Sequence, residues 1–359
     1  MKLVFAVDKN SYTDKDHVGV VKKVEAQMRL FERYGIRTTL CQYVWKNGCP
    51  DIEVEDDTDI LYFRRISPSV NMIRTLHRLR KKSPKIRMIM EIPTYPFAAE
   101  GRGKKSIKTR INGWVGEKLL KTCVNRIVLI AQPTIDKLYG IPILHINNGV
   151  DFDSILVKKQ KEPCYKENEI HLICVSGCFF WHGYDRIIEG LRRYYDGPSS
   201  KEDVFLHIVG EGNCLEEYKN MARKYGLLDN KIFFYGTKAG VELDDIYNQC
   251  DIAIECLGSH RKNIFLSSSL KSREYAAKGI PMIAANDIDI NNNKTGKYIK
   301  IFPADDSPIE IMTVIEFFHK IYDGKEKDKV ALEMRQEFYS YCDWQFVCKS
   351  VLKYINEER

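Results

Sequence analysis

The chain has 359 residues, which is too long for one typical hydrophobic core and suits two domains of about 150 to 180 residues each. Hydrophobic residues make up 44% and charged residues 29%, which excludes a disordered or low-complexity chain. No run of about 18 apolar residues is present, and the opening apolar run meets Asp8 too early for a signal peptide. We therefore expect a cytoplasmic protein. The 11 cysteines are scattered and show no CxxC pairing, so reduced core cysteines are expected.

Positive charge is concentrated in the first half of the chain. Residues 1–150 hold 27 Lys and Arg against 15 Asp and Glu, a net charge of +12, whereas the remaining residues hold 29 against 34, a net charge of −5. The surplus lies mainly at residues 78–87 and 102–121, where apolar and aromatic residues are interleaved. This pattern attracts phosphate-bearing partners, either anionic lipid headgroups or nucleic acid. The alternative is a set of solvated helix faces without a partner.

Short apolar, β-branched runs alternate with helical patterns along the whole chain. In the first half, strands are predicted at residues 3–7, 38–44, 59–65, 86–92, 126–131 and 142–150, and helices at 20–34, up to 82, and 107–122. In the second half, strands are predicted at 170–177, 204–212, 231–236, 251–256 and 280–285, and helices at 185–195, 215–225, 243–250 and 269–278. This order is typical of βαβ units and a parallel sheet.

The order predicts an α/β fold of two Rossmann-like, doubly wound parallel-sheet domains that face each other across a cleft. We place the N-terminal domain at residues 1–155, a polar linker at 156–169 and the C-terminal domain at 170–333. Residues 334–359 have helical spacing and either cap the second domain or return to the first. Ligands are expected at the carboxyl ends of the strands, where open α/β sheets bind them.

The stretch SLKSREYAAKGIP, residues 269–281, lies between two apolar strands. If a helix begins at Leu270, Lys271 and Glu274 lie three residues apart on one face, beside the free amides of the helix start. Amides and an ammonium suit anionic phosphates, and a carboxylate suits the two hydroxyls of a ribose. A surface ion pair is the alternative for such spacing.

At this point the sequence resembles the retaining GT-B glycosyltransferases, especially family 4. The elements of their second domain occur here in order, as VSG (175–177), HGYDRIIEGL (182–191), HIVGEG (207–212), KYGLLDNKIFFYG (224–236), DDIYNQCDIAIEC (244–256) and LKSREYAAKGIP (270–281). The resemblance covers residues 170–285 well and the first half only loosely. It implies that a nucleotide-diphosphate sugar is held mainly by the second domain.

The resemblance also implies roles for individual residues. Glu274 falls where the family binds the donor ribose, and the turn of Ser268, Ser269 and Leu270 falls where amides meet the diphosphate. Gly236 and Thr237 fall where the base is read. Gly210 and Gly212 fall in the family's G-x-G loop, either as donor contacts or as a tight turn.

Two positions depart from the family pattern. Leu266 replaces the glutamate that the family aims at the donor sugar, so sugar recognition must differ, and Glu255 or a main-chain group is a candidate substitute. His182 replaces a lysine used against the phosphates. Lys271 and Arg261 are candidates to restore that positive charge, and His182 itself is expected to protonate beside a diphosphate.

Candidates in the first half are fewer. Gly19, in the segment HVGV after the first strand, falls where the family places a glycine loop near the donor phosphates, with Lys22 or Lys23 adding charge. A βα turn without function is the alternative. Glu91 or Tyr95, near the end of the strand at 86–92, is a candidate to shape the acceptor site.

The resemblance implies a hexosyltransferase-type enzyme that moves a sugar, with retention, to a saccharide or lipid-linked acceptor. The resemblance further implies that the leaving diphosphate itself helps to deprotonate the acceptor, and we expect Lys271 and Arg261 to stabilise that diphosphate. No DxD acidic motif lies in a suitable loop, so we predict neither a metal nor another cofactor. The basic first domain suggests a polyprenyl-linked acceptor at the inner face of the cell membrane, in cell-surface polysaccharide synthesis, with no nucleic-acid partner.

Two other functions remain open. A sugar-nucleotide epimerase has the same architecture but needs several carboxylates and a histidine as acid and base. A non-catalytic nucleotide-sugar binder would explain Leu266 and His182. Nicotinamide-dependent oxidoreduction is disfavoured, since no GxGxxG follows either domain's first strand.

Overall fold

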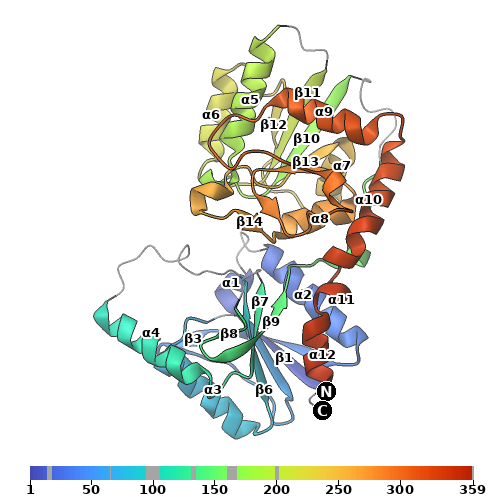
Figure 1. Cartoon of the computed structure of the whole chain (residues 1–359). Helices are drawn as coiled ribbons and strands as arrows, with labels where there is room; N and C mark the ends of the chain where they lie inside the picture. Colours follow the sequence, from blue (N-terminus) through green and yellow to red (C-terminus); the bar gives the residue numbers. More distant parts are fainter. Residues whose placement is uncertain are drawn as a thin grey trace. The chain divides into compact units, whose positions relative to one another are not determined.

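The computed structural model describes residues 1–13, 18–64, 66–93, 106–130, 135–159, 168–198 and 202–357. The chain forms two compact units (Figure 1). Unit 1 comprises Met1–Gly149 with Trp344–Arg359, and unit 2 comprises Val150–Asp343. Each unit is an α/β structure around its own largely parallel sheet, which confirms the predicted fold class.

Unit 1 contains a seven-stranded sheet in the order β2-β1-β5-β6-β7-β9-β8. Its strands are β1 (Lys2–Asp8), β2 (Arg37–Tyr43), β5 (Ile60–Arg64), β6 (Arg87–Ile92), β7 (Arg126–Ile130), β8 (Lys137–Leu138) and β9 (Ile141–Ile146). All neighbours pair in parallel except β8 and β9. The order reverses at β1, which pairs with β2 on one side and β5 on the other, as in a doubly wound sheet.

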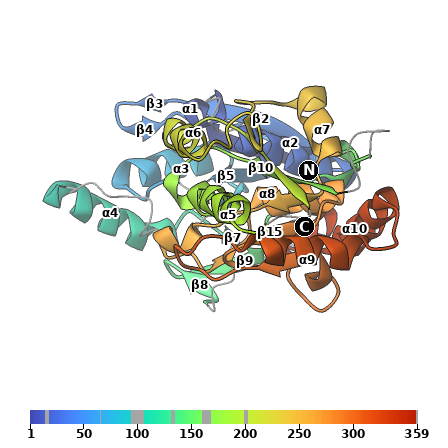
Figure 2. The ribbon, with the colours of Figure 1, turned by 90° about the horizontal axis from the view of Figure 1, so that it is seen from above.

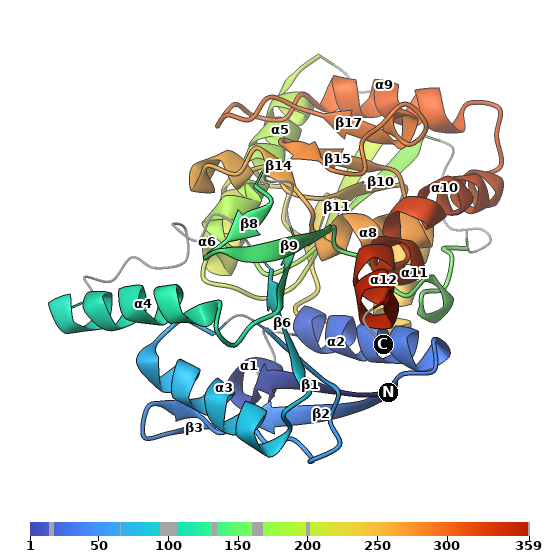
Figure 3. The same ribbon diagram turned by 60° about the horizontal axis from the view of Figure 1, so that its bottom comes forward.

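Helices cover both faces of this sheet because the side chains of each strand alternate between them. Leu3 and Phe5 pack in one apolar cluster with α2 (Val18–Arg33), α11 (Trp344–Val347) and α12 (Lys349–Glu357). Val4 and Ala6 pack in the opposite cluster with α3 (Val70–Lys82) and the end of α4 (Ile107–Leu120). Figure 3 shows α2 and α12 on one side of the sheet and α3 on the other.

Unit 2 contains a six-stranded parallel sheet in the order β12-β11-β10-β13-β15-β17. Its strands are β10 (Glu169–Val175), β11 (Asp203–Val209), β12 (Ile232–Phe234), β13 (Ile252–Ile254), β15 (Met282–Ala284) and β17 (Ile299–Ile301). Its α-helices are α5 (Tyr184–Asp196), α6 (Leu215–Lys224), α7 (Gly240–Gln249), α8 (Leu270–Lys278), α9 (Ile311–Tyr322) and α10 (Lys327–Cys342), and Figure 2 shows α5, α9 and α10 from above. A separate short parallel pair joins β14 (Leu266–Ser267) to β16 (Asp287–Ile288).

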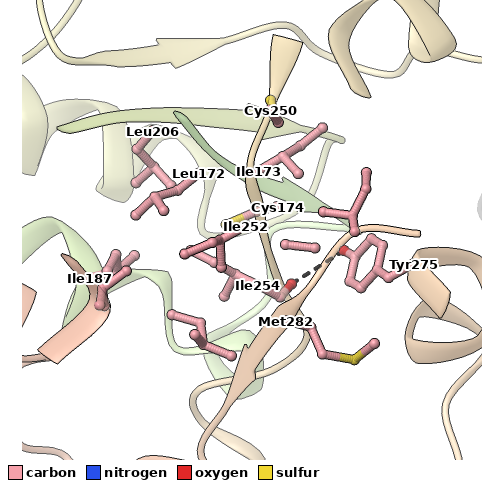
Figure 4. Packing of buried hydrophobic residues seen from close by; sticks show 14 of the residues in the cluster. Leu172, Ile173, Cys174, Ile187, Leu206, Cys250, Ile252, Ile254, Tyr275 and Met282 are labelled. Carbon is pink, nitrogen blue, oxygen red and sulfur yellow. Dashed lines mark hydrogen bonds between the residues drawn. The ribbon is translucent and has the colours of Figure 1, made fainter. Parts of the chain in front are cut away.

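One tyrosine fixes helix α8 against the sheet of unit 2 (Figure 4). The hydroxyl of Tyr275, which is fully buried, donates to the carbonyl of Ile254 at 3.2 Å and accepts from the amide of Val175 at 3.2 Å. These two residues lie at the ends of the neighbouring strands β13 and β10. The start of α8 is thereby held at the carboxyl edge of the sheet.

The sequence patterns did not predict the short elements α1 (Lys9–Thr13), β8, the hairpin β3 (Trp45–Lys46) with β4 (Cys49–Pro50), and the pair β14 and β16. They also missed β17 and α9. The predicted C-terminal helix is divided: α10 belongs to unit 2 and ends at Cys342, whereas α11 and α12 belong to unit 1. The ten described cysteines are free thiols. Within the described ranges, no helix has both the length and the apolar composition that crossing a bilayer requires.

Candidate functional site

The strand order of unit 2 creates a switch point between β10 and β13. From β10 the chain runs outward through β11 and β12, then returns to β13 and runs outward the other way through β15 and β17. The loops that follow β10 and β13 therefore diverge at the carboxyl edge of the sheet, where open α/β sheets bind ligands. All the residues predicted as donor contacts in the second half lie in these loops, in the loops after β11 and β12, or in the first turns of α8.

Helix α8 begins at Leu270, as predicted. Ser269 is its N-cap, and the Ser269 hydroxyl accepts from the amide of Ser272 at 3.2 Å. The amides before Ser272 have no partner within the helix, so they remain available to an anion. Leu270, Lys271 and Glu274 are half-buried, and the other six residues of α8 are buried. Lys271 and Glu274 therefore lie on the one accessible face of the helix.

Lys271 and Glu274 are not used for internal contacts. Within the described ranges, neither side chain forms a hydrogen bond or an ion pair, although they are three residues apart. An ion pair between them, the alternative drawn from the sequence, is therefore absent from the structure. A half-buried ammonium and carboxylate on one helix face are available to a ligand that carries both phosphate and hydroxyl groups.

Arg273 holds the turn before α8 in place. The side chain is fully buried; its guanidinium pairs with Asp289 and donates to the hydroxyls of Ser268 at 3.0 Å and Ser272 at 2.9 Å. Ser268 and Ser269 are thus fixed by the helix cap and by a buried ion pair. Arg273 was not predicted as a site residue, because an arginine on a helix is usually exposed and nothing in its spacing indicates burial.

His182 is neutral in this structure. It ends a short 3-10 helix, η4 (Phe180–His182), and its Nδ1 donates to the carbonyl of Gly177. Burial, together with the charge of nearby Lys271, lowers the pKa of His182 to about 2. A carbonyl only accepts, so the proton lies on Nδ1 and Nε2 is left as an acceptor. Protonation of His182 beside a diphosphate stays a prediction, and Lys271 is the nearby cation that lowers its pKa here.

Arg261 also departs from its predicted role. It lies in η5 (Ser259–Lys262), and its guanidinium binds both oxygens of Asp185, at 2.9 and 2.7 Å. It also donates to Asp306 at 2.7 Å and to the carbonyl of Phe180 at 2.6 Å. With two carboxylates and a carbonyl bound, Arg261 is occupied in joining the loops after β10 and β13. The geometry gives it a positioning role rather than contact with a leaving group.

Gly210 and Gly212 are required by backbone packing. A Cβ on Gly210 (φ +139) would lie 2.1 Å from the carbonyl oxygen of Ser176, and one on Gly212 (φ +157) would lie 2.4 Å from that of Cys178. Only glycine fits these positions without moving the loop after β10. The structure thus favours the tight-turn interpretation of the G-x-G loop.

The loop after β12 adjoins the same group of loops. The carbonyl of Gly236 (φ +64) accepts from the amide of Gly210 at 2.8 Å, and the next residue, Thr237, is exposed. On the other side, the amide of Leu257 donates to the carbonyl of His182 at 2.9 Å. Backbone contacts therefore join all four loops at the carboxyl edge of unit 2.

Glu255 is a buried carboxylate with an unsatisfied oxygen. It follows β13 directly, is 1% exposed, and its Oε2 has no hydrogen-bond donor among the described residues. Both Glu255 and Lys271 act electrostatically on the thiol of Cys256. A buried carboxylate oxygen without a donor is costly, which makes this residue a candidate for a ligand contact.

The unit 1 candidates lie elsewhere than predicted. Glu91 is buried in a network in which it accepts from Lys23 at 2.9 Å, Gln27 at 3.1 Å and Tyr62 at 2.8 Å. Although burial acts to raise its pKa, the charges of Lys23 and Arg64 lower the pKa of Glu91 to about 2. Glu91 is thus an interior structural residue, which corrects the prediction that it shapes an acceptor site. Because the Lys23 ammonium is paired with Glu91 in this network, it is not available to a phosphate.

Gly19 is the second residue of α2 and is exposed, so it lies in a helical turn rather than in a loop before the helix. His17 and Tyr95 lie outside the described residues. The described parts of the chain contain no group of three or more His, Cys, Asp or Glu side chains placed to hold a metal ion. Metal independence stays a prediction.

Comparison with known proteins agrees with this geometry. Residues 158–292 match the family model described as Glycosyl transferases group 1. That segment contains every loop of the unit 2 site. No curated protein sequence shows significant similarity to the chain.

Solved structures resemble the chain over its whole length at low sequence identity. They include a sucrose-phosphate synthase from Thermosynechococcus elongatus (TM-score 0.64, 9% identity, 100% of this chain and 99% of that chain). A glycosyltransferase from Rickettsia africae ESF-5 has a TM-score of 0.63, 15% identity and coverage of 100% and 99%. An alpha-glucosyltransferase in complex with UDP-glucose and abasic DNA has a TM-score of 0.61, 11% identity and coverage of 99% and 100%. Identities this low show the fold alone. The chain therefore has the GT-B fold, and residues 158–292 in its second unit match the glycosyl transferases group 1 family.

Proposed function

We propose that this chain is a glycosyltransferase that takes a sugar from a nucleotide-diphosphate donor bound by unit 2. The observation that carries the proposal is the start of α8, where free amides, the Lys271 ammonium and the Glu274 carboxylate share one accessible face. The amides and Lys271 suit the diphosphate, and Glu274 suits the ribose hydroxyls. The match of this segment to a glycosyltransferase family supports the same assignment.

In the proposed mechanism, the charge of the leaving diphosphate is the quantity that the protein stabilises. In this proposal Lys271 and the first amides of α8 lie where negative charge develops, so little reorganisation is needed as the glycosidic bond breaks. We propose a hexosyl transfer with retention, in which the leaving diphosphate accepts the proton of the acceptor hydroxyl. His182, with Nε2 as an acceptor beside Lys271, is proposed to bind a donor hydroxyl rather than a phosphate.

Sugar recognition is proposed to involve Glu255. Leu266, at the position where related enzymes carry a carboxylate, is exposed and cannot bind a hydroxyl group through its side chain. Glu255 is the carboxylate at the end of β13 with an oxygen that lacks a donor. A sugar hydroxyl would supply that donor.

The acceptor is proposed to be a saccharide or a polyprenyl-linked saccharide used in cell-surface polysaccharide synthesis. The net charge of +12 on residues 1–150 supports an acceptor presented at an anionic membrane. We accordingly propose that the protein works in the cytoplasm at the inner face of the cell membrane.

Calorimetric titration with uridine, guanosine and cytidine diphosphates and their sugars tests the donor proposal. We expect one nucleotide series to bind, and Lys271→Ala and Glu274→Ala each to raise the donor Kd at least tenfold. Glu216 and Lys219 give matched controls, because they have the same spacing on α6 of the same unit but pair with each other at 3.2 Å. Glu216→Ala and Lys219→Ala should change the Kd less than twofold. Unchanged affinity in Glu274→Ala would remove its assignment.

Release of free nucleotide separates the proposed enzyme from its alternatives. A transferase hydrolyses its donor slowly when no acceptor is present, and release accelerates with an acceptor. A non-catalytic binder gives tight binding without release. An epimerase converts the sugar while it stays attached to the nucleotide, which chromatography of the sugar nucleotide detects.

A further inference from the structure

Helix α4 of unit 1 presents an apolar stripe to solvent. Ile107, Ile111 and Trp114 are 76%, 58% and 61% exposed, and their spacing of four and three residues places them on one face. A hollow of about 360 Å³ is lined by these three side chains and Arg110. Exposed side chains of this size usually occur singly, so three in one stripe indicate a binding surface.

The opposite face of α4 is fixed to α3. A Cβ on Gly116 would lie 2.4 Å from the amide of Ser69, so the two backbones are in close contact. The side chain of Asn112 accepts from the amide of Val70 at 3.0 Å, and Leu120 is buried in the core of unit 1. Figures 1 and 3 both show the amino-terminal end of α4 standing clear of the other ribbons of unit 1. The stripe is therefore displayed on a helix that is held firmly at its other end.

Cations border the stripe. Lys108 and Arg110 lie in its first turn and Lys118 near its end, with the Lys118 ammonium 5.9 Å from the ring centre of Trp114. Among the described residues none of these three cations forms an ion pair with an acidic side chain. Lys121, which is exposed, follows directly at the C-cap. With Glu117 as the only acidic residue of α4, the helix thus combines large apolar groups with a surplus of positive charge.

We propose that α4 is a membrane-binding element that inserts Ile107, Ile111 and Trp114 into the interface of an anionic bilayer. The apolar side chains reach the boundary of the acyl chains, the indole suits the headgroup level, and the long cationic side chains extend to lipid phosphates. A nucleic acid would use the cations but leave the aliphatic side chains in water. The charge and the apolar stripe are both satisfied by a lipid surface.

This inference names the partner of unit 1 within the proposed function, but it does not depend on donor chemistry. Its test is sedimentation of the full chain with phosphatidylcholine vesicles with and without phosphatidylglycerol, at low and at high salt. We expect binding to the anionic vesicles that weakens as salt rises. A chain that binds sugar nucleotides but no vesicle would overturn this inference alone; one that binds vesicles but no nucleotide would overturn the proposed function alone.

Ile111→Asp and Leu332→Asp form a matched pair, because Leu332 lies on α10 of unit 2 and is 57% exposed. Both variants add the same charge at the same exposure and should fold normally. We expect Ile111→Asp to lower the vesicle partition coefficient at least tenfold and Leu332→Asp to lower it less than twofold. Equal losses, or preferential binding of duplex or single-stranded nucleic acid over vesicles, would contradict the proposal.

The fluorescence of Trp114 gives a second readout at the site itself. On adding anionic vesicles, the emission should shift to the blue as the indole leaves water. The shift should be absent in Trp114→Phe and present in Trp45→Phe, which removes another tryptophan of unit 1 that is 45% exposed. A shift that persists in Trp114→Phe would show that α4 is not the inserted element.

Discussion

Arg261 binds both carboxylate oxygens of Asp185, at 2.9 and 2.7 Å, and so ties the loop after β13 to the start of α5. A bidentate pair of this kind stabilises the bound geometry by about 1–3 kcal/mol when it is shielded from solvent. We expect Arg261→Ala and Asp185→Ala to raise the donor Kd by similar factors, and the double variant to add little. A double-mutant cycle on donor affinity measures this coupling.

A direct catalytic role for Arg261 predicts a different result. If the guanidinium stabilised the leaving diphosphate, Arg261→Ala would lower kcat far more than Asp185→Ala. Lys262→Ala is the control. The Lys262 ammonium neighbours Arg261 in sequence, but it lies 3.9 Å from the ring centre of Trp181 and takes no part in the Asp185 pair.

The replacement of Gly210 by alanine should disrupt the site through the backbone. Its added Cβ would lie 2.1 Å from the carbonyl oxygen of Ser176, so the loop after β10 would have to move. Gly226 is the matched control, because it also has a positive φ (+68) but no atom within 4 Å of the added Cβ. We expect Gly226→Ala to cost about 1 kcal/mol from backbone strain and to leave donor binding intact.

Gly210→Ala should lower the stability of unit 2 by more than the roughly 1 kcal/mol expected for Gly226→Ala. It should also raise the donor Kd at least tenfold. Urea unfolding monitored by hydrogen exchange in unit 2 measures the stability. Calorimetry measures the donor Kd. If the two glycine variants behaved alike, close backbone approach would not be the reason for glycine at residue 210.

The main helices and strands follow from the pattern of apolar residues along the chain. Strands such as β1 and β10 were predictable because they are short, almost continuously apolar runs, as expected for strands buried on both faces. The helix start at Leu270 was predictable because a serine N-cap precedes it. Two-residue strands such as β14 have no period to detect. The partners of buried charges were not predictable either, because the contacts of Glu91 and Arg273 join segments far apart in the chain. Sequence position alone placed Glu91 at a site, and the structure places it in the core.

The Lys23–Glu91 pair should contribute to stability and not to donor binding. Removal of one partner leaves the other charge buried without compensation, so Glu91→Ala is expected to lower the stability of unit 1 by about 3–5 kcal/mol. The double variant Lys23→Met with Glu91→Leu should recover much of this loss. Urea unfolding monitored by hydrogen exchange in β6 measures the stability of unit 1. At a temperature where the variants are folded, calorimetry should show an unchanged donor Kd. A loss of donor or acceptor affinity in the folded double variant would restore a functional role for Glu91.

Glu255→Gln separates structural from functional reasons for the buried carboxylate. The amide keeps the shape of the side chain and removes a charge whose Oε2 has no donor among the described residues, so the melting temperature should stay equal or rise. The affinity for the nucleoside diphosphate alone should be unchanged, whereas the additional affinity for the sugar nucleotide should fall. Calorimetry with the diphosphate and with its sugar conjugate gives both values. A lower melting temperature with unaltered sugar discrimination would assign Glu255 to the core.

Two buried histidines, His171 and His207, and the half-buried His182 should make unit 2 sensitive to mild acid. Burial lowers the pKa of His171 to about 3, of His207 to about 4 and, with the charge of Lys271, of His182 to about 2. In the unfolded chain each titrates near pH 6.5. Between about pH 6.5 and 4 the unfolded state therefore binds protons that the folded state does not, so stability falls as pH falls, by up to about 1.4 kcal/mol per pH unit for each histidine.

Urea unfolding at pH 7, 6 and 5, monitored by hydrogen exchange in β10 and β11, measures how the free energy of unfolding changes with pH. His171→Gln should remove about one histidine's share of it, whereas His319→Gln, at a side chain that is 44% exposed, should leave the slope close to that of the unmodified chain. The carboxylates whose pKa values are lowered to about 2, Glu91 and Glu189, lose their contribution only below about pH 4.5, so they do not obscure the histidine range. A flat stability profile from pH 7 to 5 would contradict this, since it would show that the three imidazoles take up protons without unfolding.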